Sequence, residues 1–255
     1  MRKITALLFL FFILTTALVA EQTSDAKVIA SYEVTGSQIS GLPDDHGKIW
    51  TRVRTLVASD LLRLVNRFEL FEVEERPDQL QTDGFALLNE DLETFTLALS
   101  LKSAQLAFFD RKPEEVESFQ KTIVHEQAHI LSLQGTQFDR SDSPSGPLEI
   151  DEGVLKAGSY LNQFHARFWK KAFPGRGTET VSDADAAVLF KKLRASFVSE
   201  YAATGPVEDF AESFSAFVTE AKPKGSAIKN LKVKFFYDWP ELVSMRTEIR
   251  KGLTP

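Results

Sequence analysis

The sequence contains no cysteine among its 255 residues. This absence excludes disulfide bonds, thiolate metal ligands and a cysteine nucleophile. After the first twenty residues there is no long apolar run, which excludes a protein with several membrane-spanning helices. Basic residues are in the minority, with 30 Lys and Arg against 36 Asp and Glu. Because an acidic chain repels a phosphate backbone, we expect no nucleic acid partner.

The first twenty residues have the three-part pattern of a secretory signal peptide. Arg2 and Lys3 precede the apolar run Ala6–Leu14, and small residues follow up to Ala20. As a helix, the apolar segment would span about 22 Å, less than the hydrocarbon core of about 30 Å. We therefore predict a signal peptide over 1–20 and a periplasmic or secreted protein. After cleavage we expect no stable membrane association, and export without cysteine favours a bacterial source.

The first half of the mature chain predicts strands and one helix. Alternating or apolar patterns indicate strands over 27–34 and 68–73, and the spacing of apolar residues predicts an amphipathic helix over 47–67. Thr94 to Leu101 alternates most clearly, and with 84–88 before it we expect a β-hairpin.

The second half of the mature chain is mainly helical in its pattern. Pro113 and the glutamates after it suit the first turn of a helix over 113–134. A polar loop is expected from there to about Gly153. Further helices are predicted over 154–173, 183–201, 206–221 and 240–252. Strands followed by helices indicate an α+β fold and not a βαβ alternation, in a single domain over 21–255.

A metal-binding pattern lies inside the helix predicted over 113–134. His125, Glu126 and His129 form the motif HEQAH, which contains two of the four histidines in the chain. Residues at i and i+4 share one face of a helix, so both imidazoles can reach one ion. Glu126 can then take a proton from a water that the metal activates, which is the chemistry of peptide hydrolysis.

Two histidines need a third protein ligand, and the sequence leaves several possibilities. His46 lies in a loop and His165 in a predicted helix, and we expect both at the surface or in an interface. The carboxylate candidates are Glu152, Glu200 and Glu208. Glu208 forms an i,i+4 pair with Glu212, so one carboxylate could bind metal while the other orients a ligand imidazole. The alternative is that the pair belongs to a solvated acidic stripe.

The segment Tyr201 to Phe214, YAATGPVEDFAESF, resembles the third-ligand motif of the anthrax lethal factor protease domain and the Pro-Pro endopeptidases. The resemblance implies a zincin-like fold in which Glu208 is the third zinc ligand. It also implies that Tyr201 donates a hydrogen bond to the oxyanion and that Glu212 supports the ligands from behind. Two features depart from the family: Ala128 replaces its usual glycine, and the insert before Glu208 is longer.

These features together predict an exported zinc endopeptidase that binds one Zn²⁺ per chain and acts on a peptide or protein substrate. Glu126 would be the general base. In the zincin class an edge strand pairs with the substrate, and the strand over 94–101 comes in the right order to belong to that sheet. The alternative is a non-catalytic exported module that binds zinc or a partner on a zincin scaffold. The presence of both Glu126 and Tyr201 favours the hydrolase.

Overall fold

The structure is a computed structural model that describes residues 26–73, 83–174 and 176–253. The predicted signal peptide over 1–20 lies outside these residues. Within them, no helix has both the length and the apolar character needed to cross a bilayer.

Four strands of the N-terminal half form one mixed sheet. They are β1 (Ala26–Glu33), β2 (Val65–Val73), β3 (Gly84–Leu88) and β4 (Phe95–Ser100). Their order in the sheet is β1-β2-β4-β3. β2 and β4 are parallel, whereas β1–β2 and β3–β4 are antiparallel. The hairpin predicted from the sequence is therefore confirmed as β3–β4, and β3 lies at one edge of the sheet.

The helix predicted over 47–67 is wrong in its second half. α2 (Asp44–Leu56) ends before Val57, a short α3 (Ser59–Leu62) follows, and the chain is already extended in β2. The Gln127 side chain explains the break, because its amide oxygen accepts from the Ala58 N–H at 2.9 Å and its amide nitrogen donates to the Leu56 carbonyl at 2.7 Å. A distant side chain thus replaces the hydrogen bonds of a continuous helix.

The remaining elements are mostly helical. Two predicted helices are shorter than expected. The one over 154–173 starts only at Tyr160, where the Ser159 side chain caps it, because the preceding residues pair in a small hairpin. The one over 183–201 ends at Lys192.

The elements after the four-stranded sheet are α4 (Leu101–Phe108), α5 (Pro113–Leu133), η1 (Gly135–Gln137), β5 (Leu148–Ile150), β6 (Gly153–Leu155), α6 (Tyr160–Phe168), α7 (Asp183–Lys192), η2 (Tyr201–Ala203), α8 (Pro206–Thr219), α9 (Ile228–Phe235), η3 (Phe236–Asp238) and α10 (Pro240–Gly252).

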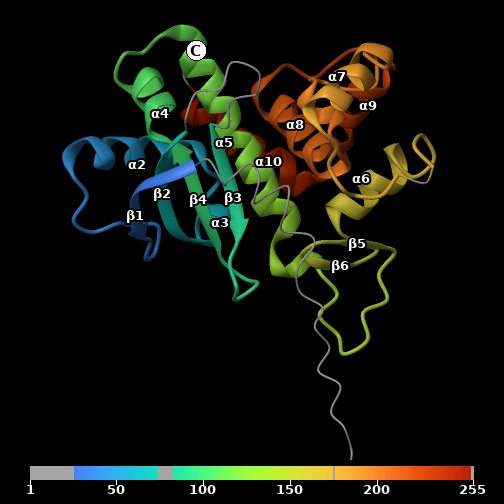
Figure 1. The fold of residues 1–255 in the computed structure, drawn as a ribbon, viewed down its shortest axis with the longest axis horizontal. Helices are drawn as coiled ribbons and strands as arrows, with labels where there is room; N and C mark the ends of the chain where they lie inside the picture. Colours follow the sequence, from blue (N-terminus) through green and yellow to red (C-terminus); the bar gives the residue numbers. More distant parts are fainter. Residues whose placement is uncertain (1–25, 74–82, 175, 254–255) are drawn as a thin grey trace, which may run out of the picture.

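The predicted α+β class is confirmed. Figure 1 shows the sheet on one side of α5 and the helices α6 to α9 on the other. The helical side is held by aromatic packing, in which the buried Phe236 contacts the rings of Phe164, Phe210, Phe214 and Phe217 at centroid distances of 5.1–6.2 Å. α5 therefore lies between two apolar layers, and its residues 123–133 are all buried. This order of sheet, central helix and helical half is the one that the resemblance to a zincin-like fold led us to expect.

Candidate metal centre

The two histidines of HEQAH lie on the buried half of α5. His125 and His129 are only 7% and 9% exposed. Their Nε2 atoms are 3.0 Å apart, as the i,i+4 spacing on one helix face predicts. The apolar residues around the motif fill the other faces of α5, so the helix cannot turn these imidazoles toward bulk solvent without uncovering its core.

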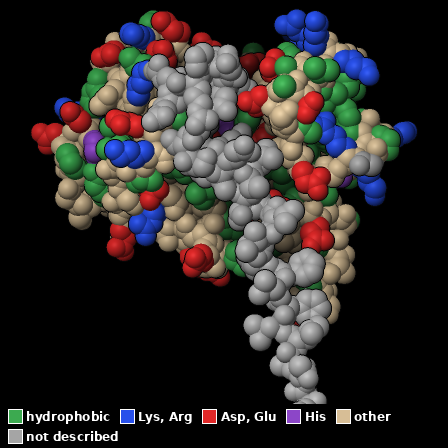
Figure 2. Space-filling model, in the orientation of Figure 1, with side chains coloured by type: hydrophobic (Ala, Val, Ile, Leu, Met, Phe, Trp, Pro, Cys, Tyr) green, Lys and Arg blue, Asp and Glu red, His purple; other side chains and the backbone are tan. Residues whose placement is uncertain are grey.

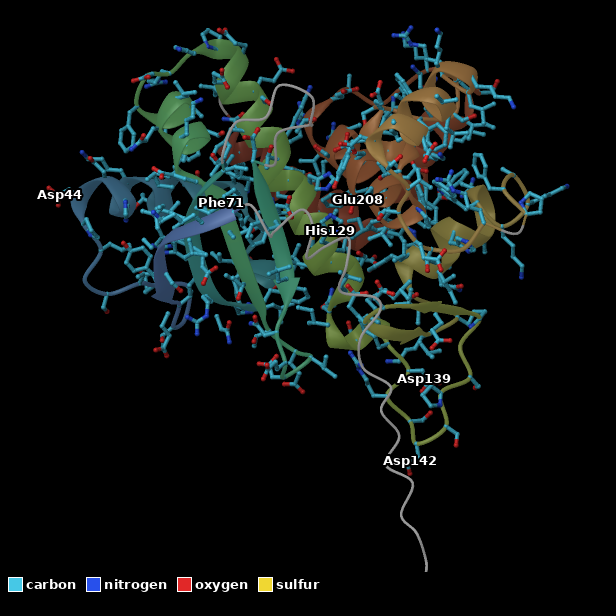
Figure 3. All side chains as sticks on the ribbon, viewed as in Figure 1. Asp44, Phe71, His129, Asp139, Asp142 and Glu208 are labelled. Atoms are coloured by element: carbon cyan, nitrogen blue, oxygen red, sulfur yellow. The ribbon has the colours of Figure 1, made fainter. Side chains whose placement is uncertain are left out.

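Glu208 approaches both imidazoles from the first turn of α8. Its Oε2 lies 3.1 Å from Nε2 of His125 and 3.4 Å from Nε2 of His129. Among the described residues, His125, His129 and Glu208 are the group whose ligand atoms lie close enough together to hold a metal ion. Ligands at 2.0–2.1 Å around a tetrahedral zinc lie about 3.3 Å from one another. The observed separations of 3.0–3.4 Å match this spacing, so the three residues fit a zinc ion. Figure 3 labels two of them, His129 and Glu208, which lie close together.

Glu212 lies one turn further along α8 and contacts the other side of the His125 ring. Its Oε1 is 2.7 Å from Nδ1 of His125, and the Ser199 side chain also hydrogen-bonds to the Glu212 carboxylate. A carboxylate on Nδ1 holds the proton on that nitrogen and leaves Nε2 as the ligand atom. The i,i+4 pair predicted from the sequence is therefore directed inward, and it is not a solvated stripe.

The electrostatics of the cluster favour charged carboxylates. Burial alone would lower the pKa of His125, but hydrogen bonds that its ring donates to Glu208 and Glu212 outweigh burial and raise that pKa well above its usual value. The pKa of His129 is also raised, against the effect of burial, by the charge of Glu208. Burial would raise the pKa of Glu208, yet the two imidazoles hold it far below its usual range. A metal ion would therefore compete with protons for the two imidazoles.

Glu126 is buried beside the ligands but bonds to the edge strand β3. It is 4% exposed, and burial raises the pKa of its carboxyl. The backbone N–H of Ala86 on β3 hydrogen-bonds to this carboxylate. Gly84 makes the close approach of β3 possible, because a Cβ at this position would lie 3.0 Å from Thr122 Cγ2 and 3.3 Å from Glu126 Cγ.

The edge of β3 next to the site has backbone groups that do not pair with β4. Asp83 and Asn89 flank β3 and bond to the β4 side. The Asp83 carbonyl accepts from the Ser100 N–H at 2.8 Å, and the Asn89 N–H donates to the Thr94 carbonyl at 2.9 Å. In an antiparallel pair such residues alternate with residues whose N–H and C=O face away. Gly84, Ala86 and Leu88 therefore present their backbone to the open edge, which agrees with the Ala86–Glu126 hydrogen bond.

Tyr201 lies beside the His125 ring. It is the first residue of η2, directly before α8, and its ring centroid is 5.7 Å from that of His125, with 40° between the ring planes. The structure therefore brings together all the residues that we predicted for the site: His125, Glu126, His129, Tyr201, Glu208 and Glu212. Their roles as ligands, base and donor are not shown by proximity alone.

The other candidates lie outside this group. Glu152 is in the turn between β5 and β6. Burial raises its pKa, and His129 is close enough to oppose that effect, yet Glu152 is not among the three converging ligands. Glu200 precedes η2 and is not helical, contrary to our prediction. His46 bonds to the Tyr32 hydroxyl at 2.6 Å, and His165 is half-buried on α6.

Sequence reasoning missed two supports of the site. Gln127, a variable position of the motif, ties α5 to the α2–α3 break. Asp209, adjacent to Glu208, is completely buried and pairs with Lys232 of α9, a helix that we did not predict. No local pattern marks these partners, since each contact joins residues far apart in the chain. A polar residue placed within an apolar helical stripe is the only signal that could have pointed to them.

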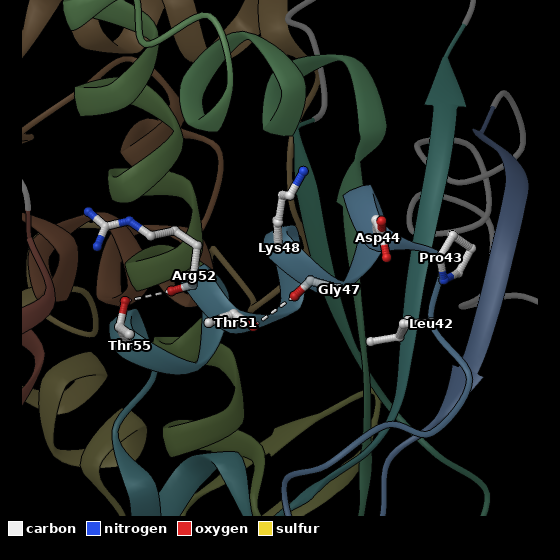
Figure 4. A pocket seen from close by; sticks show the side chains of 8 residues that line it. All are labelled: Leu42, Pro43, Asp44, Gly47, Lys48, Thr51, Arg52 and Thr55. Carbon is white, nitrogen blue, oxygen red and sulfur yellow. Dashed lines mark hydrogen bonds between the residues drawn. The ribbon is translucent and has the colours of Figure 1, made fainter.

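Elsewhere in the part of the chain that the structure describes, no second set of side chains converges in this way. An open hollow runs along α2, and the hydroxyls of Thr51 and Thr55 in it already donate to carbonyls of their own helix at 2.8 and 2.7 Å (Figure 4). Its lining residues are Leu42, Pro43, Asp44, Gly47, Lys48, Thr51, Arg52 and Thr55. On the face drawn in Figure 2, Lys and Arg side chains are interspersed with Asp and Glu.

Comparison with known proteins adds little. No model of a known protein family matches the chain, and neither does any curated protein. Among solved structures, it is similar to a crystal structure from Bacteroides caccae described as a "putative zinc-binding metallo-peptidase". The two chains are 19% identical with a TM-score of 0.39, and the similarity covers 82% of this chain and 75% of that one. The likeness is too weak to carry an argument, so the assignment of the site depends on its own geometry.

Proposed function

We propose that this protein is an exported zinc-dependent endopeptidase. One observation carries the proposal: Nε2 of His125, Nε2 of His129 and Oε2 of Glu208 converge with tetrahedral ligand spacing. Zinc at this position would act as a Lewis acid on a carbonyl and make a water molecule more acidic. Three protein ligands among the described residues, and not four, are typical of a catalytic and not a structural zinc site.

Glu126 is the general base in this proposal. It follows the first ligand directly but is not one of the three converging residues. The raised pKa of Glu126 lies closer to the pH at which the protein works. A carboxylate with such a pKa accepts a proton from water and returns it to the leaving amine more easily. The Ala86 N–H holds the carboxylate in place from the edge of the sheet.

Tyr201 supplies a hydrogen bond to the oxyanion that develops as the peptide carbonyl becomes tetrahedral. Its place beside the His125 ring supports this role. The substrate would lie extended along β3, where the outward backbone groups of Gly84 and Leu88, on either side of Ala86, can pair with it. A peptide bound there would run past Glu126, with its scissile carbonyl between the base and Tyr201.

Peptide cleavage by the zinc-loaded protein tests this function, with Glu126→Gln as the matched variant. The amide keeps the size and the hydrogen-bonding capacity of Glu126 but cannot take the proton. We expect the wild type to cleave members of a peptide library, and Glu126→Gln to keep its zinc while losing about 10²–10⁴ in rate. A zinc-loaded wild type that cleaves nothing would favour a non-catalytic zinc-binding module instead.

A further inference from the structure

Glu208 and Asp209 are neighbours at the start of α8 and face different parts of the molecule. Successive residues of an α-helix are about 100° apart around its axis. Glu208 faces α5 and the histidines, while Asp209 points into the packing against α6 and α9. The two carboxylates are therefore coupled: a rotation of α8 that moves one of them moves the other.

Asp209 is held by two donors from outside its helix. Its Oδ2 accepts from Nε1 of Trp169, at the end of α6, at 2.7 Å, and lies 2.5 Å from Nζ of Lys232 on α9. The side chains of Asp209 and Lys232 are both completely buried. The Lys232 ammonium also lies 4.1 Å from the ring centroid of Phe197, a distance at which a cation is attracted by the ring face.

Stability alone does not account for a buried ion pair at this position. Removing two charges from water costs free energy that their attraction only partly returns, and apolar residues of similar size are often as stable. A pair of this kind instead fixes one arrangement of the elements that carry it, because any other arrangement leaves a buried charge without a partner.

The first turn of α8 is the part of the helix that most needs such fixing. It begins after Gly205 without a side-chain cap. By contrast, Arg246 and Arg250 bind the carbonyls of Phe217 and Val218 at the far end, each at 2.6 Å. Metal ligands must be held within about 0.5 Å and 10–20° of their productive geometry.

We propose that the buried Asp209–Lys232 ion pair is a positioning element of the metal centre, which sets the rotation of α8 so that Glu208 reaches the two histidines. The proposal rests on the zinc site inferred above. Glu212 depends on the same rotation, so the ion pair also maintains the carboxylate on Nδ1 of His125. Neither residue touches the metal or the substrate, and both act through Glu208 and Glu212.

The double variant Asp209→Asn with Lys232→Met separates positioning from stability. It removes both charges without leaving either unpaired, keeps the side-chain volumes, and retains an oxygen that accepts from Trp169. We expect the zinc-free variant to unfold at nearly the wild-type temperature, while its zinc affinity falls about 10–100-fold, as for other residues that orient ligands. The visible absorption of the cobalt-substituted protein should also shift.

Lys229→Met is the matched control, because it removes a lysine from the same helix that makes no ion pair among the described residues. Zinc affinity is measured by competition with a chromophoric chelator. The control should match the wild type in affinity and in the cobalt spectrum. A folded double variant with wild-type zinc affinity and an unchanged cobalt spectrum would overturn the proposal. Failure of the zinc site itself would be seen separately, as a wild type that takes up no zinc.

Discussion

His125 is the most constrained residue of the site, because both of its ring nitrogens face carboxylates. Glu212 bonds to Nδ1 and Glu208 to Nε2, at 2.7 and 3.1 Å. The first contact holds a proton on Nδ1, and the second places a carboxylate oxygen beside Nε2, the nitrogen that would bind the metal. His129 shows no such contact at its other nitrogen among the described residues. We infer that His125 sets the geometry of the site and that His129 completes it.

At the same scale, Tyr201 should matter for turnover but not for the metal. Tyr201→Phe removes only a hydroxyl, so zinc content and KM should remain those of the wild type. Loss of one oxyanion donor typically lowers kcat by about 10²–10³, and steady-state kinetics with a cleaved peptide would measure this. Tyr160→Phe is the control, since the Tyr160 hydroxyl bonds to Glu241 on the surface. An unchanged kcat for Tyr201→Phe would remove Tyr201 from the mechanism.

At the scale of elements, α5 is fixed by polar contacts as well as by its apolar faces. Gln127 bonds to two backbone groups at the α2–α3 break and to the Ile123 carbonyl. The motif positions that hold no metal thus orient the helix that presents the two histidines. Substitution of Gln127 should therefore affect the whole fold more than the chemistry.

Gln127→Leu should lower the free energy of unfolding by about 2–4 kcal/mol, because each buried backbone group left unpaired costs about 1–3 kcal/mol. Chemical denaturation of the zinc-free protein would measure this. Gln120→Leu is a matched control on the same helix, since Gln120 is buried and its Nε2 has no partner among the described residues. We expect the control to be neutral or stabilising. Equal losses for the two variants would contradict the anchoring role of Gln127.

The sequence predicted elements best where the pattern was local. The alternation over 94–101 and the spacing over 113–134 depend on neighbouring residues, and both agree with β4 and α5. The second half of the helix predicted over 47–67 failed because Gln127 interrupts it at Ala58, 69 residues away, a contact that no local pattern encodes. The helix α9 was missed because alternating lysines hide its apolar face, and one of these lysines is the buried Lys232.

For the molecule as a whole, the HEQAH residues were predictable because their chemistry is carried by spacing, whereas the roles expected of Tyr201, Glu208 and Glu212 came from the resemblance of their segment to a known motif. The i,i+4 histidines and the Tyr201–Glu208 segment both depend on short-range order, and the fold brings the two segments together across α5 and α8. What the sequence could not supply is the environment of these residues. The inward direction of Glu212 and the closeness of β3 to Glu126 both arise from packing between distant elements.

The charge state of the cluster predicts how the stability of the whole protein depends on pH. The raised pKa values of His125 and His129 stabilise the zinc-free protein fully below their usual 6.5, and this contribution is lost as the pH rises through the raised values. The depressed pKa of Glu208 contributes above its usual 4.5 and is lost on acidification. The zinc-free protein should therefore be most stable between these limits.

Zinc binds unprotonated imidazoles. The stabilisation that zinc gives should therefore grow as the pH rises, opposite to the contribution of the protonated histidines. The difference in Tm between zinc-loaded and zinc-free protein should widen from about pH 6 to about pH 8. Thermal unfolding at a fixed zinc concentration would measure it. A Tm difference independent of pH would show that the histidines do not exchange protons for metal.

Metal analysis of the purified protein and two variants tests the site most directly. The wild type should carry about one zinc per chain, as two imidazoles and a carboxylate predict. Glu208→Ala should lose the zinc, because it removes one of the three converging ligands. Glu152→Ala should keep it, since that carboxylate lies near His129 but does not converge with the ligands. Loss of zinc from Glu152→Ala with retention by Glu208→Ala would contradict the proposed metal centre.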